Sequence, residues 1–213
     1  MVLAATDTTS NSLEWATYYL TRDPKVQAKV QAEIDAVIGF ERLPSLSDRA
    51  HMVYTEATIA ELLRMSSVIP LGILHQTTEN ETIGDYVIPK NTAVMSNIYA
   101  VHYDPDVWGD PENFRPTRWI DPEGKLKKVD ELVSFSAGKR SCIGESLARI
   151  QLFLYITRIL QCFDVRAVGK LPSEDGFGIT LAPQHFQVKF VHRTTTGFKT
   201  TGNSRALEST LST

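Results

Sequence analysis

The 213-residue sequence contains little cysteine and no long apolar run. Its two cysteines, Cys142 and Cys162, lie at opposite ends of one predicted helix, too far apart for a disulfide bond. Reduced thiols are typical of a compartment that faces the cytosol rather than of secreted proteins. Because the best apolar stretch, residues 150–163, is interrupted by Arg158, nothing in the sequence is predicted to span a membrane. No signal-peptide pattern is found at the N-terminus.

The sequence also lacks a strong charge of either sign. Its formal net charge is −3, with 42% hydrophobic and 22% charged residues, which are ordinary values for a globular protein. This balance gives no reason to expect nucleic acid as a partner. The five histidines show no metal-ligand spacing with one another or with cysteine, so a zinc site is not expected.

The stretch over residues 135–144, FSAGKRSCIG, places Cys142 just before a predicted helix over residues 145–163. Unpaired backbone N–H groups at a helix N-terminus favour negative charge, so this thiol is expected as the thiolate, the form that attacks electrophiles or binds metal. Apolar residues at helical spacing predict one face of an amphipathic helix: Ile143, Leu147, Ile150 and Leu154.

Gly138 and Gly144 flank Cys142 and leave the backbone open to the approach of something large and flat. Arg140 adds a fixed cation that suits carboxylates. For an arbitrary sequence of this kind, a buried structural cysteine beside two solvated cations would be the simpler interpretation, because short motifs are weak hypotheses.

Position by position, however, these ten residues resemble the haem-binding loop of the cytochrome P450 family of haem-thiolate monooxygenases. The matching positions are Phe135, Gly138, Arg140, Cys142 and Gly144. The resemblance implies that Cys142 is the axial ligand of the haem iron and that Arg140 pairs with a haem propionate. A thiolate ligand pushes electron density onto iron and favours O–O cleavage.

A second stretch of the family lies in the first predicted helix, residues 1–20. Asp7 and Thr8 sit in its middle, where such residues compete for backbone hydrogen bonds, and taken alone they would form a tolerated polar face. AATDTT, residues 4–9, resembles the oxygen-activating stretch, which implies that Asp7 and Thr8 relay protons and that Ala4 lies against the haem. The family most often has glycine where this chain has Ala5.

A third motif is ELLR, which places Glu61 and Arg64 on one helical face. Such an exposed pair contributes only about 0.2–0.5 kcal/mol and is usually surface decoration. The resemblance instead implies a buried pair that is joined by an arginine from a later loop, best matched by Arg118 in FRPTRW, residues 114–119. We expect this triad to brace the scaffold rather than to take part in chemistry.

The remaining pattern predicts a mainly α fold with small β-sheets. Asp23 and Pro24 open a second helix that ends at Gly39, and Ser47 or Asp48 caps a short turn before a helix over residues 52–65. Further strands and turns follow over residues 68–97, with a hairpin-like turn at residues 84–85. Strands are predicted again over residues 163–167 and 186–191.

Two histidines and one late segment have open roles. The resemblance gives His75 a place near a haem propionate, but as a lone histidine it fits a structural role in a strand equally well. His102 is interpreted as structural, bonding to backbone across a turn. GFGIT, residues 176–180, resembles a hairpin that touches substrate through Phe177 and Ile179, and plain hairpin packing explains it equally well.

The resemblance covers residues 1 to 192 and implies the C-terminal, haem-binding part of a cytochrome P450 domain of the animal microsomal type, without its N-terminal part. Residues 193–213 are polar and are predicted to be a disordered tail. The implied cofactor is haem b, with electrons from NADPH through a cytochrome P450 reductase type of flavoprotein that docks near Lys139 and Arg149. The implied location is the cytosolic face of the endoplasmic reticulum membrane, through an anchor outside this sequence.

The implied function is insertion of one atom of O2 into a small lipophilic substrate of steroid, fatty-acid, hormone or xenobiotic type. One alternative is a truncated or incomplete chain with no catalytic activity of its own. Another keeps the haem without oxygen activation, as in relatives that rearrange peroxides, and the Asp7–Thr8 pair argues against it.

Overall fold

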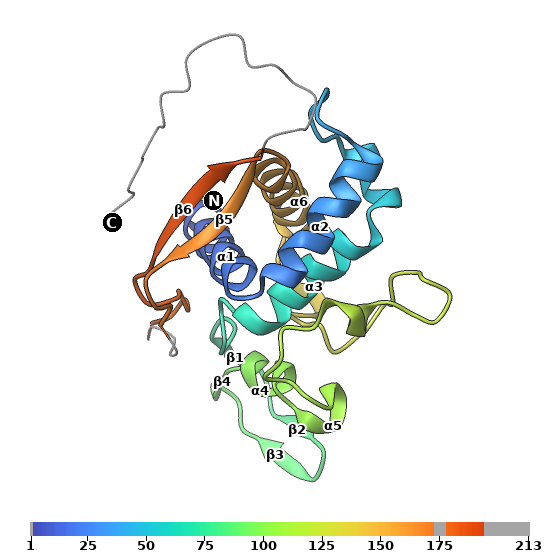
Figure 1. Ribbon diagram of the computed structural model, residues 1–213. Helices are drawn as coiled ribbons and strands as arrows, with labels where there is room; N and C mark the ends of the chain where they lie inside the picture. Colours follow the sequence, from blue (N-terminus) through green and yellow to red (C-terminus); the bar gives the residue numbers. More distant parts are fainter. Residues whose placement is uncertain (1, 173–177, 194–213) are drawn as a thin grey trace.

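The computed structural model describes residues 2–172 and 178–193, and its fold is mainly helical with small antiparallel sheets, which confirms the predicted class. The body consists of the helices α1 (Val2–Arg22), α2 (Pro24–Val37), α3 (Val53–Ser66) and α6 (Glu145–Cys162) (Figure 1). Within the described ranges, no helix combines the length and the apolar character that crossing a membrane requires.

Shorter elements complete the described chain. The short helices are α4 (Ile98–His102), α5 (Pro105–Trp108) and the 3-10 turns η1 (Leu46–His51), η2 (Pro116–Trp119) and η3 (Gly138–Arg140). The strands are β1 (His75–Gln76), β2 (Glu81–Ile83), β3 (Tyr86–Ile88), β4 (Ala93–Val94), β5 (Phe163–Val168) and β6 (Gln187–His192). They pair antiparallel as β1–β4, β2–β3 and β5–β6.

Local signals set the ends of α2 as predicted. The carboxylate of Asp23 accepts the backbone N–H groups of Lys25 and Val26, both at 3.1 Å. At the other end Gly39 has a φ of 72°, and its N–H donates to the carbonyl of Ile34 at 3.0 Å. The predicted cap of the following turn is wrong: Ser45 caps η1.

The Ser45 cap belongs to a capping box with Asp48, a local pattern that the sequence interpretation overlooked when it placed the cap at Ser47 or Asp48. Asp48 lies inside η1, where its Oδ2 accepts the backbone N–H of Ser45 at 2.8 Å. The same carboxylate binds the Arg42 guanidinium through two contacts of 2.8 Å. These bonds hold the pKa of Asp48 below its usual range, chiefly through Arg42.

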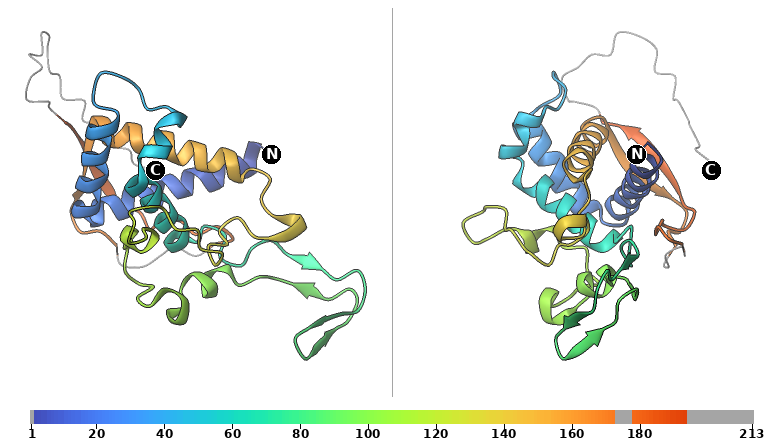
Figure 2. Two further views of the ribbon diagram at one scale, coloured as in Figure 1. Left: turned by 90° about the vertical axis from the view of Figure 1, so that its right-hand side faces the viewer. Right: turned by 180° about the vertical axis from the view of Figure 1, so that it is seen from behind.

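The four long helices share one hydrophobic core, and α1 and α6 lie side by side within it (Figure 2). The predicted apolar face of α6 is wrong at its start, because Ile143 is 84% exposed and Leu147 53% exposed. The face that packs into the core lies on another side of the helix. Its buried members are Leu152, Phe153, Ile156 and Leu160.

Side-chain amides of α2 bind the β5–β6 pair to the helices. Gln27 is buried, and its Nε2 donates to the carbonyl of Val165 at 3.0 Å while its Oε1 accepts the Val165 N–H at 2.8 Å. Gln31 donates to the carbonyl of Phe163 at 3.1 Å. These amides satisfy backbone groups of β5 on the side away from β6, which would otherwise be buried without partners.

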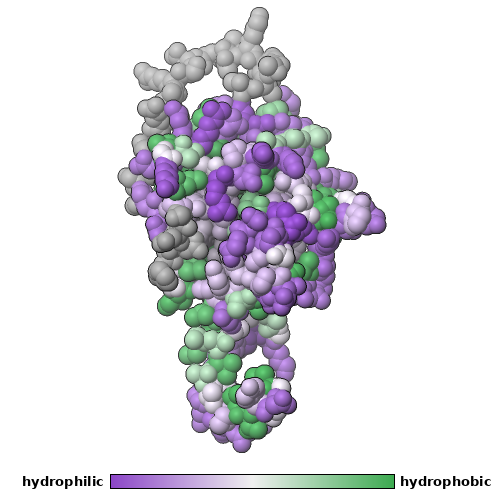
Figure 3. Space-filling model, turned by 60° about the horizontal axis from the view of Figure 1, so that its bottom comes forward, coloured by the Kyte–Doolittle hydropathy of each residue, from purple (hydrophilic) through white to green (hydrophobic). Residues whose placement is uncertain are grey.

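The chain from β1 to α5 forms a narrow lobe below the helices (Figure 1). Its β2–β3 hairpin turns at Gly84, which has a φ of 57°, so the predicted hairpin is confirmed. The hairpin projects away from the helices (Figure 2). Its exposed residues include Ile83 and Val87, and hydrophobic surface gathers on this lobe (Figure 3).

The predicted tail begins too early, because Arg193 is bound to the helical body. Its backbone N–H donates to the carbonyl of Cys162 at 2.9 Å, and its guanidinium contacts Asp35 at 2.6 Å. Residues 194–213 lie outside the described ranges, so the prediction for them remains a prediction.

Replacing Gln27 with Ala tests its role as a bonding partner of β5. We expect the free energy of unfolding to fall by about 2–3 kcal/mol, because both backbone groups of Val165 on that side lose a buried partner. Urea unfolding followed by tryptophan fluorescence measures the change. Gln184→Ala, at an exposed glutamine, is the control and should change stability by less than about 0.5 kcal/mol. Equal effects of the two substitutions would contradict the assignment.

Candidate functional site

A cavity of about 350 Å³ lies between α1, the end of α3 with its following loop, and the segment that contains Cys142. Most of its wall is apolar. Most of the lining residues that the sequence singled out lie in three parts of the wall: the first turns of α1, the start of α6 and residues 134–144. Ile143 and Leu147, which the sequence assigned to an amphipathic face, line the cavity. The apolar lining residues that the sequence did not single out include Leu63, Val68, Ile69, Ile73 and Ile98.

These residues were missed because their side chains look like core residues in the sequence. Ile73 and Leu147 are well exposed in the structure, at 64% and 53%, because they face the cavity instead of the packed interior. The sequence did contain one signal of a second apolar surface on α6. Its apolar positions occupy more of the helix circumference than a single core-facing stripe needs. The misassigned apolar face of α6 and the unidentified apolar residues of the cavity wall therefore have one cause: residues that face a cavity look like core residues in the sequence.

Residues 133–144, called here the Cys142 loop, have a fixed backbone. The N–H of Cys142 donates to the carbonyl of Phe135 at 2.8 Å, and the N–H of Ser136 donates to the carbonyl of Val133 at 2.8 Å. Ser136 and Gly138 both adopt left-handed backbone conformations, with φ of 62° and 75°. These bonds close a tight turn that presents Cys142 at its end.

The two glycines of the loop act differently. A Cβ added at Gly138 would meet nothing within 4 Å, so its glycine is needed for the positive φ and not for space, and Gly138 does not line the cavity. Gly144 lines the cavity and is the N-cap residue of α6. A Cβ there would lie 3.8 Å from the sulfur of Cys142, which is ordinary contact. Cys142 thus precedes the cap rather than starting the helix.

The thiol of Cys142 is free, exposed and part of the cavity wall. Phe135 also lines the wall, and the guanidinium carbon of Arg149 lies 5.0 Å from the centroid of its ring. Arg149 is held in turn by Glu145, with Nε 2.9 Å from Oε1. Among the described residues, no group of three or more His, Cys, Asp or Glu side chains could hold a metal ion.

The α1 wall presents Ala4, Ala5, Thr8 and Thr9 to the cavity. The hydroxyl of Thr8 donates to the carbonyl of Ala4 at 2.8 Å, so it is oriented by its own helix. Asp7 is exposed and does not line the cavity. The structure therefore brings Thr8 and Ala4 to the site and places the Asp7 carboxylate in solvent beside it.

Arg140 and His75 both line the cavity from elements far apart in the sequence. Arg140 ends η3 in the Cys142 loop, and His75 lies in β1 opposite Val94 of β4. Both side chains are exposed to solvent. Ile179 is 87% exposed and is not part of the lining, and Phe177 lies outside the described residues.

The structure joins Glu61, Arg64 and Arg118 in one cluster beneath the site. The Glu61 carboxylate is fully buried and accepts hydrogen bonds from Arg64 at 2.9 and 3.0 Å and from Arg118 at 2.9 Å. It also accepts the indole N–H of Trp119 at 2.8 Å and the backbone N–H of Arg115 at 2.9 Å. The buried negative charge is therefore matched by two guanidiniums and two further donors.

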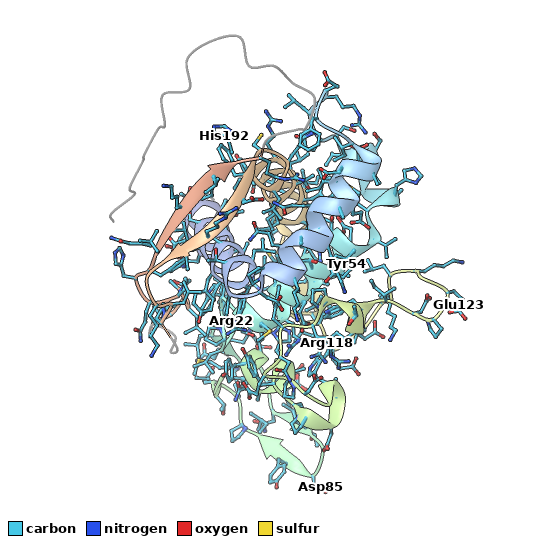
Figure 4. The ribbon with its side chains drawn as sticks, viewed as in Figure 1. Arg22, Tyr54, Asp85, Arg118, Glu123 and His192 are labelled. Carbon is cyan, nitrogen blue, oxygen red and sulfur yellow. The ribbon has the colours of Figure 1, made fainter. Side chains whose placement is uncertain are left out.

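The two arginines of this cluster also donate hydrogen bonds to backbone carbonyls outside the long helices. Arg64 donates to the carbonyls of His102 at 2.7 Å and Pro111 at 2.8 Å. Arg118 donates to the carbonyl of Trp108 at 2.7 Å. Figure 4 shows Arg118 where the helical body meets the lower lobe. The cluster thus fixes the position of the segment that leads from α3 to the Cys142 loop.

The residues present fit a flat, mostly apolar group with anionic edges. The wall is largely apolar, Arg140 supplies a cation at the cavity, and Cys142 offers one free sulfur. One protein ligand suffices for an iron whose equatorial positions are filled by a macrocycle, whereas an ion bound by the protein alone needs several. The donor set therefore suits haem better than a bare metal ion.

Comparison with known proteins gives concordant matches. The family model described as cytochrome P450 matches residues 1–190. Cytochrome P450 2U1 of Homo sapiens is 45% identical over 91% of this chain and 36% of its own length. Steroid 17-alpha-hydroxylase/17,20 lyase of Squalus acanthias is 43% identical over 87% of this chain and 38% of its own length. This chain spans little more than a third of the length of these curated relatives.

Replacing Glu61 with Gln tests the buried cluster. We expect the free energy of unfolding to fall by about 3–5 kcal/mol, because two guanidiniums lose their buried counter-charge and the new amide N–H₂ faces other donors. Denaturant unfolding monitored by circular dichroism measures the loss. Glu145→Gln removes an ion pair at the surface of α6 and should cost less than about 1 kcal/mol. A loss for Glu61→Gln as small as that of the control would show that the cluster does not carry the fold.

Proposed function

Since the chain belongs to the cytochrome P450 family, we propose that it carries the haem-thiolate site of a monooxygenase, which inserts one atom of O2 into a small lipophilic substrate. The observation that carries the proposal is the free thiol of Cys142 in the wall of an apolar cavity. A loop held by backbone hydrogen bonds presents this thiol, and α1 with Thr8 forms another wall of the same cavity.

In this proposal the chain's residues would hold haem b as follows. Cys142 would be the iron ligand, and Arg140 and His75 would bind the propionates. Phe135, Gly144 and Ala4 would contact the haem, while Gly138 shapes the loop through its backbone. When bound, haem with a thiolate ligand supplies activation of O2 by favouring cleavage of the O–O bond.

Thr8 and Asp7 have separate tasks in the proposed proton supply. The Thr8 hydroxyl lies in the cavity wall, and its hydrogen bond to the Ala4 carbonyl fixes the position of its oxygen. The lone pairs of that oxygen can accept a hydrogen bond from a group in the cavity. Asp7 is exposed and next to Thr8 in the chain, so it can exchange protons with solvent. Protons would pass from Asp7 into the cavity along water that donates a hydrogen bond to Thr8, since of these two side chains only Thr8 reaches the cavity.

The substrate class follows from the cavity wall and from one relative. Apolar walls favour a lipophilic molecule, and a relative of this chain is named as a steroid hydroxylase and lyase. We propose a steroid, fatty acid, hormone or xenobiotic as the substrate type. Contacts from Phe177 and Ile179 remain predictions, and Ile179 would have to turn inward from its exposed position.

The electron donor is proposed to be an NADPH-dependent cytochrome P450 reductase type of flavoprotein. Lys139 lies exposed in the Cys142 loop and offers positive charge near the site. Arg149, also expected to face the partner, is already engaged by Glu145 and Phe135. The proposed location is the cytosolic face of the endoplasmic reticulum, with membrane attachment outside the described residues.

The ligand assignment is tested by Cys142→Ser in the chain supplied with haem. The wild-type chain should give the red-shifted Soret band of a thiolate ligand in a reduced, carbon monoxide difference spectrum, and the variant should lose it. Cys162→Ser removes the other thiol and should keep the band. A thiolate band that survives in Cys142→Ser would contradict the assignment. Absence of haem uptake by all three proteins would instead show that this chain has no catalytic activity of its own.

The propionate contact is tested by Arg140→Gln. We expect the dissociation constant for haem to rise about tenfold, as for the loss of one charge-assisted hydrogen bond at a solvated rim. Absorbance titration with haem measures the constant, and the matched control is Lys139→Gln, which removes the neighbouring cation that does not line the cavity. If both variants bind haem equally weakly, general positive charge explains the binding and the assignment of Arg140 is wrong.

A further inference from the structure

His102 is the last residue of α4 and is fully buried, yet every polar atom of its side chain has a partner. Its Nδ1 lies 2.8 Å from the hydroxyl of Ser67, at the end of α3. Its Nε2 accepts the backbone N–H of Val133, at the start of the Cys142 loop, at 3.1 Å. The imidazole therefore bridges α3 and the loop that carries the thiol, as well as bonding to backbone as expected.

The hydrogen-bond network defines the tautomer. Because Nε2 accepts from Val133, the ring proton lies on Nδ1 and is donated to the Ser67 oxygen. The Ser67 hydroxyl then donates to the carbonyl of Arg64 at 2.8 Å, and Arg64 donates to the carbonyl of His102 at 2.7 Å. The ring is thus oriented by the same arginine that binds Glu61.

The bond to Val133 continues into the loop. The carbonyl of Val133 accepts the N–H of Ser136, and the carbonyl of Phe135 accepts the N–H of Cys142, both at 2.8 Å. One other side-chain bond to α3 helps to hold this segment: the hydroxyl of Ser134 donates to the carbonyl of Leu63 at 3.0 Å. The backbone of the loop start is therefore held by an imidazole acceptor and one hydroxyl donor.

We propose that His102 is a positioning residue for the Cys142 loop: its neutral imidazole holds the Val133 N–H and so fixes the backbone that presents the thiol. The proposal rests on the proposed function only for the identity of Cys142 as the haem ligand. The positioning itself is a property of the haem-free chain and can be tested there.

The surroundings keep the imidazole neutral. Burial, and after it the nearby Arg64 guanidinium, lowers the pKa of His102 from 6.5 to about 4. From α3 the charged group that faces the ring is Arg64, which is paired with Glu61, while Ser67 and Val133 present uncharged groups. A protonated ring would turn Nε2 into a donor opposite another donor, so protonation and the bond to Val133 exclude each other.

Two variants distinguish the roles of the two ring nitrogen atoms of His102. His102→Gln places an oxygen near Nε2 and can still accept from Val133, whereas His102→Asn places a donor near Nδ1 and leaves Val133 without a partner. Hydrogen exchange at the amides of residues 133–142 should speed up about tenfold in the Asn variant, the effect of one lost hydrogen bond, and should stay near wild type in the Gln variant. His51→Gln, at an exposed histidine of η1, is the matched control.

The pH dependence provides a second measurement that does not require the Asn variant to fold. In the wild-type chain, the folded pKa lies below the unfolded value, so stability of the closed loop is fully present above pH 6.5 and is lost as pH falls toward 4. The opening constant, corrected for intrinsic exchange, should rise by up to about tenfold per pH unit in that window. In His102→Gln the slope should disappear.

Alkylation of the two cysteines gives a third readout within one molecule. Loosening of the loop should change the alkylation rate of Cys142 at least about threefold in His102→Asn and leave Cys162, at the far end of α6, unchanged. Equal acceleration of exchange throughout the helical body, or equal behaviour of the Gln and Asn variants, would overturn the proposal. Failure of the chain to bind haem would show that this chain has no catalytic activity of its own, and it would leave these measurements unaffected.

Discussion

The structure depends first on the buried carboxylate of Glu61. A charge with no access to water is tolerated only when donors surround it, and here two guanidiniums, an indole and a backbone amide do so. Arg64 and Arg118 then use their remaining N–H groups on carbonyls of a segment with little regular structure. One desolvated charge thus helps to order this segment, together with the buried cluster in which Trp108 and Trp119 pack against Ala57 and Ala60 of α3.

The candidate site is built where this ordered segment returns to the helices. His102 and Ser134 connect the start of the Cys142 loop to α3, and the start of α6 and the first turns of α1 complete the wall. The thiol of Cys142 is consequently held by backbone bonds at a cavity that few polar groups line. A rigid loop and an apolar wall are what a large, flat cofactor with one protein ligand requires.

Short-range features were predictable from particular residues. Asp23 and Gly39 delimit α2 as expected, the turn at Gly84 closes the hairpin, and the ELLR pattern with Arg118 indicated contacts that the structure contains. The exposed face at the start of α6 was taken for a core face, because apolar residues that face a cavity have the same periodicity as residues that face a core. The cap of η1 was placed at Ser47 or Asp48 instead of Ser45, although Ser45 and Asp48 form a capping box within four residues of chain.

The sequence by itself determined the family, the mainly helical class and the residue types of the site, because caps, turns and motif spacings act over a few residues of chain. Only the tertiary structure decided which apolar residues line the cavity, that Thr8 reaches it while Asp7 faces solvent, and that His102 connects α3 to the Cys142 loop. These outcomes depend on how α1, α3, α6 and the loop pack together. Packing joins residues far apart in the chain, and no local pattern specifies the direction in which a helix face finally points.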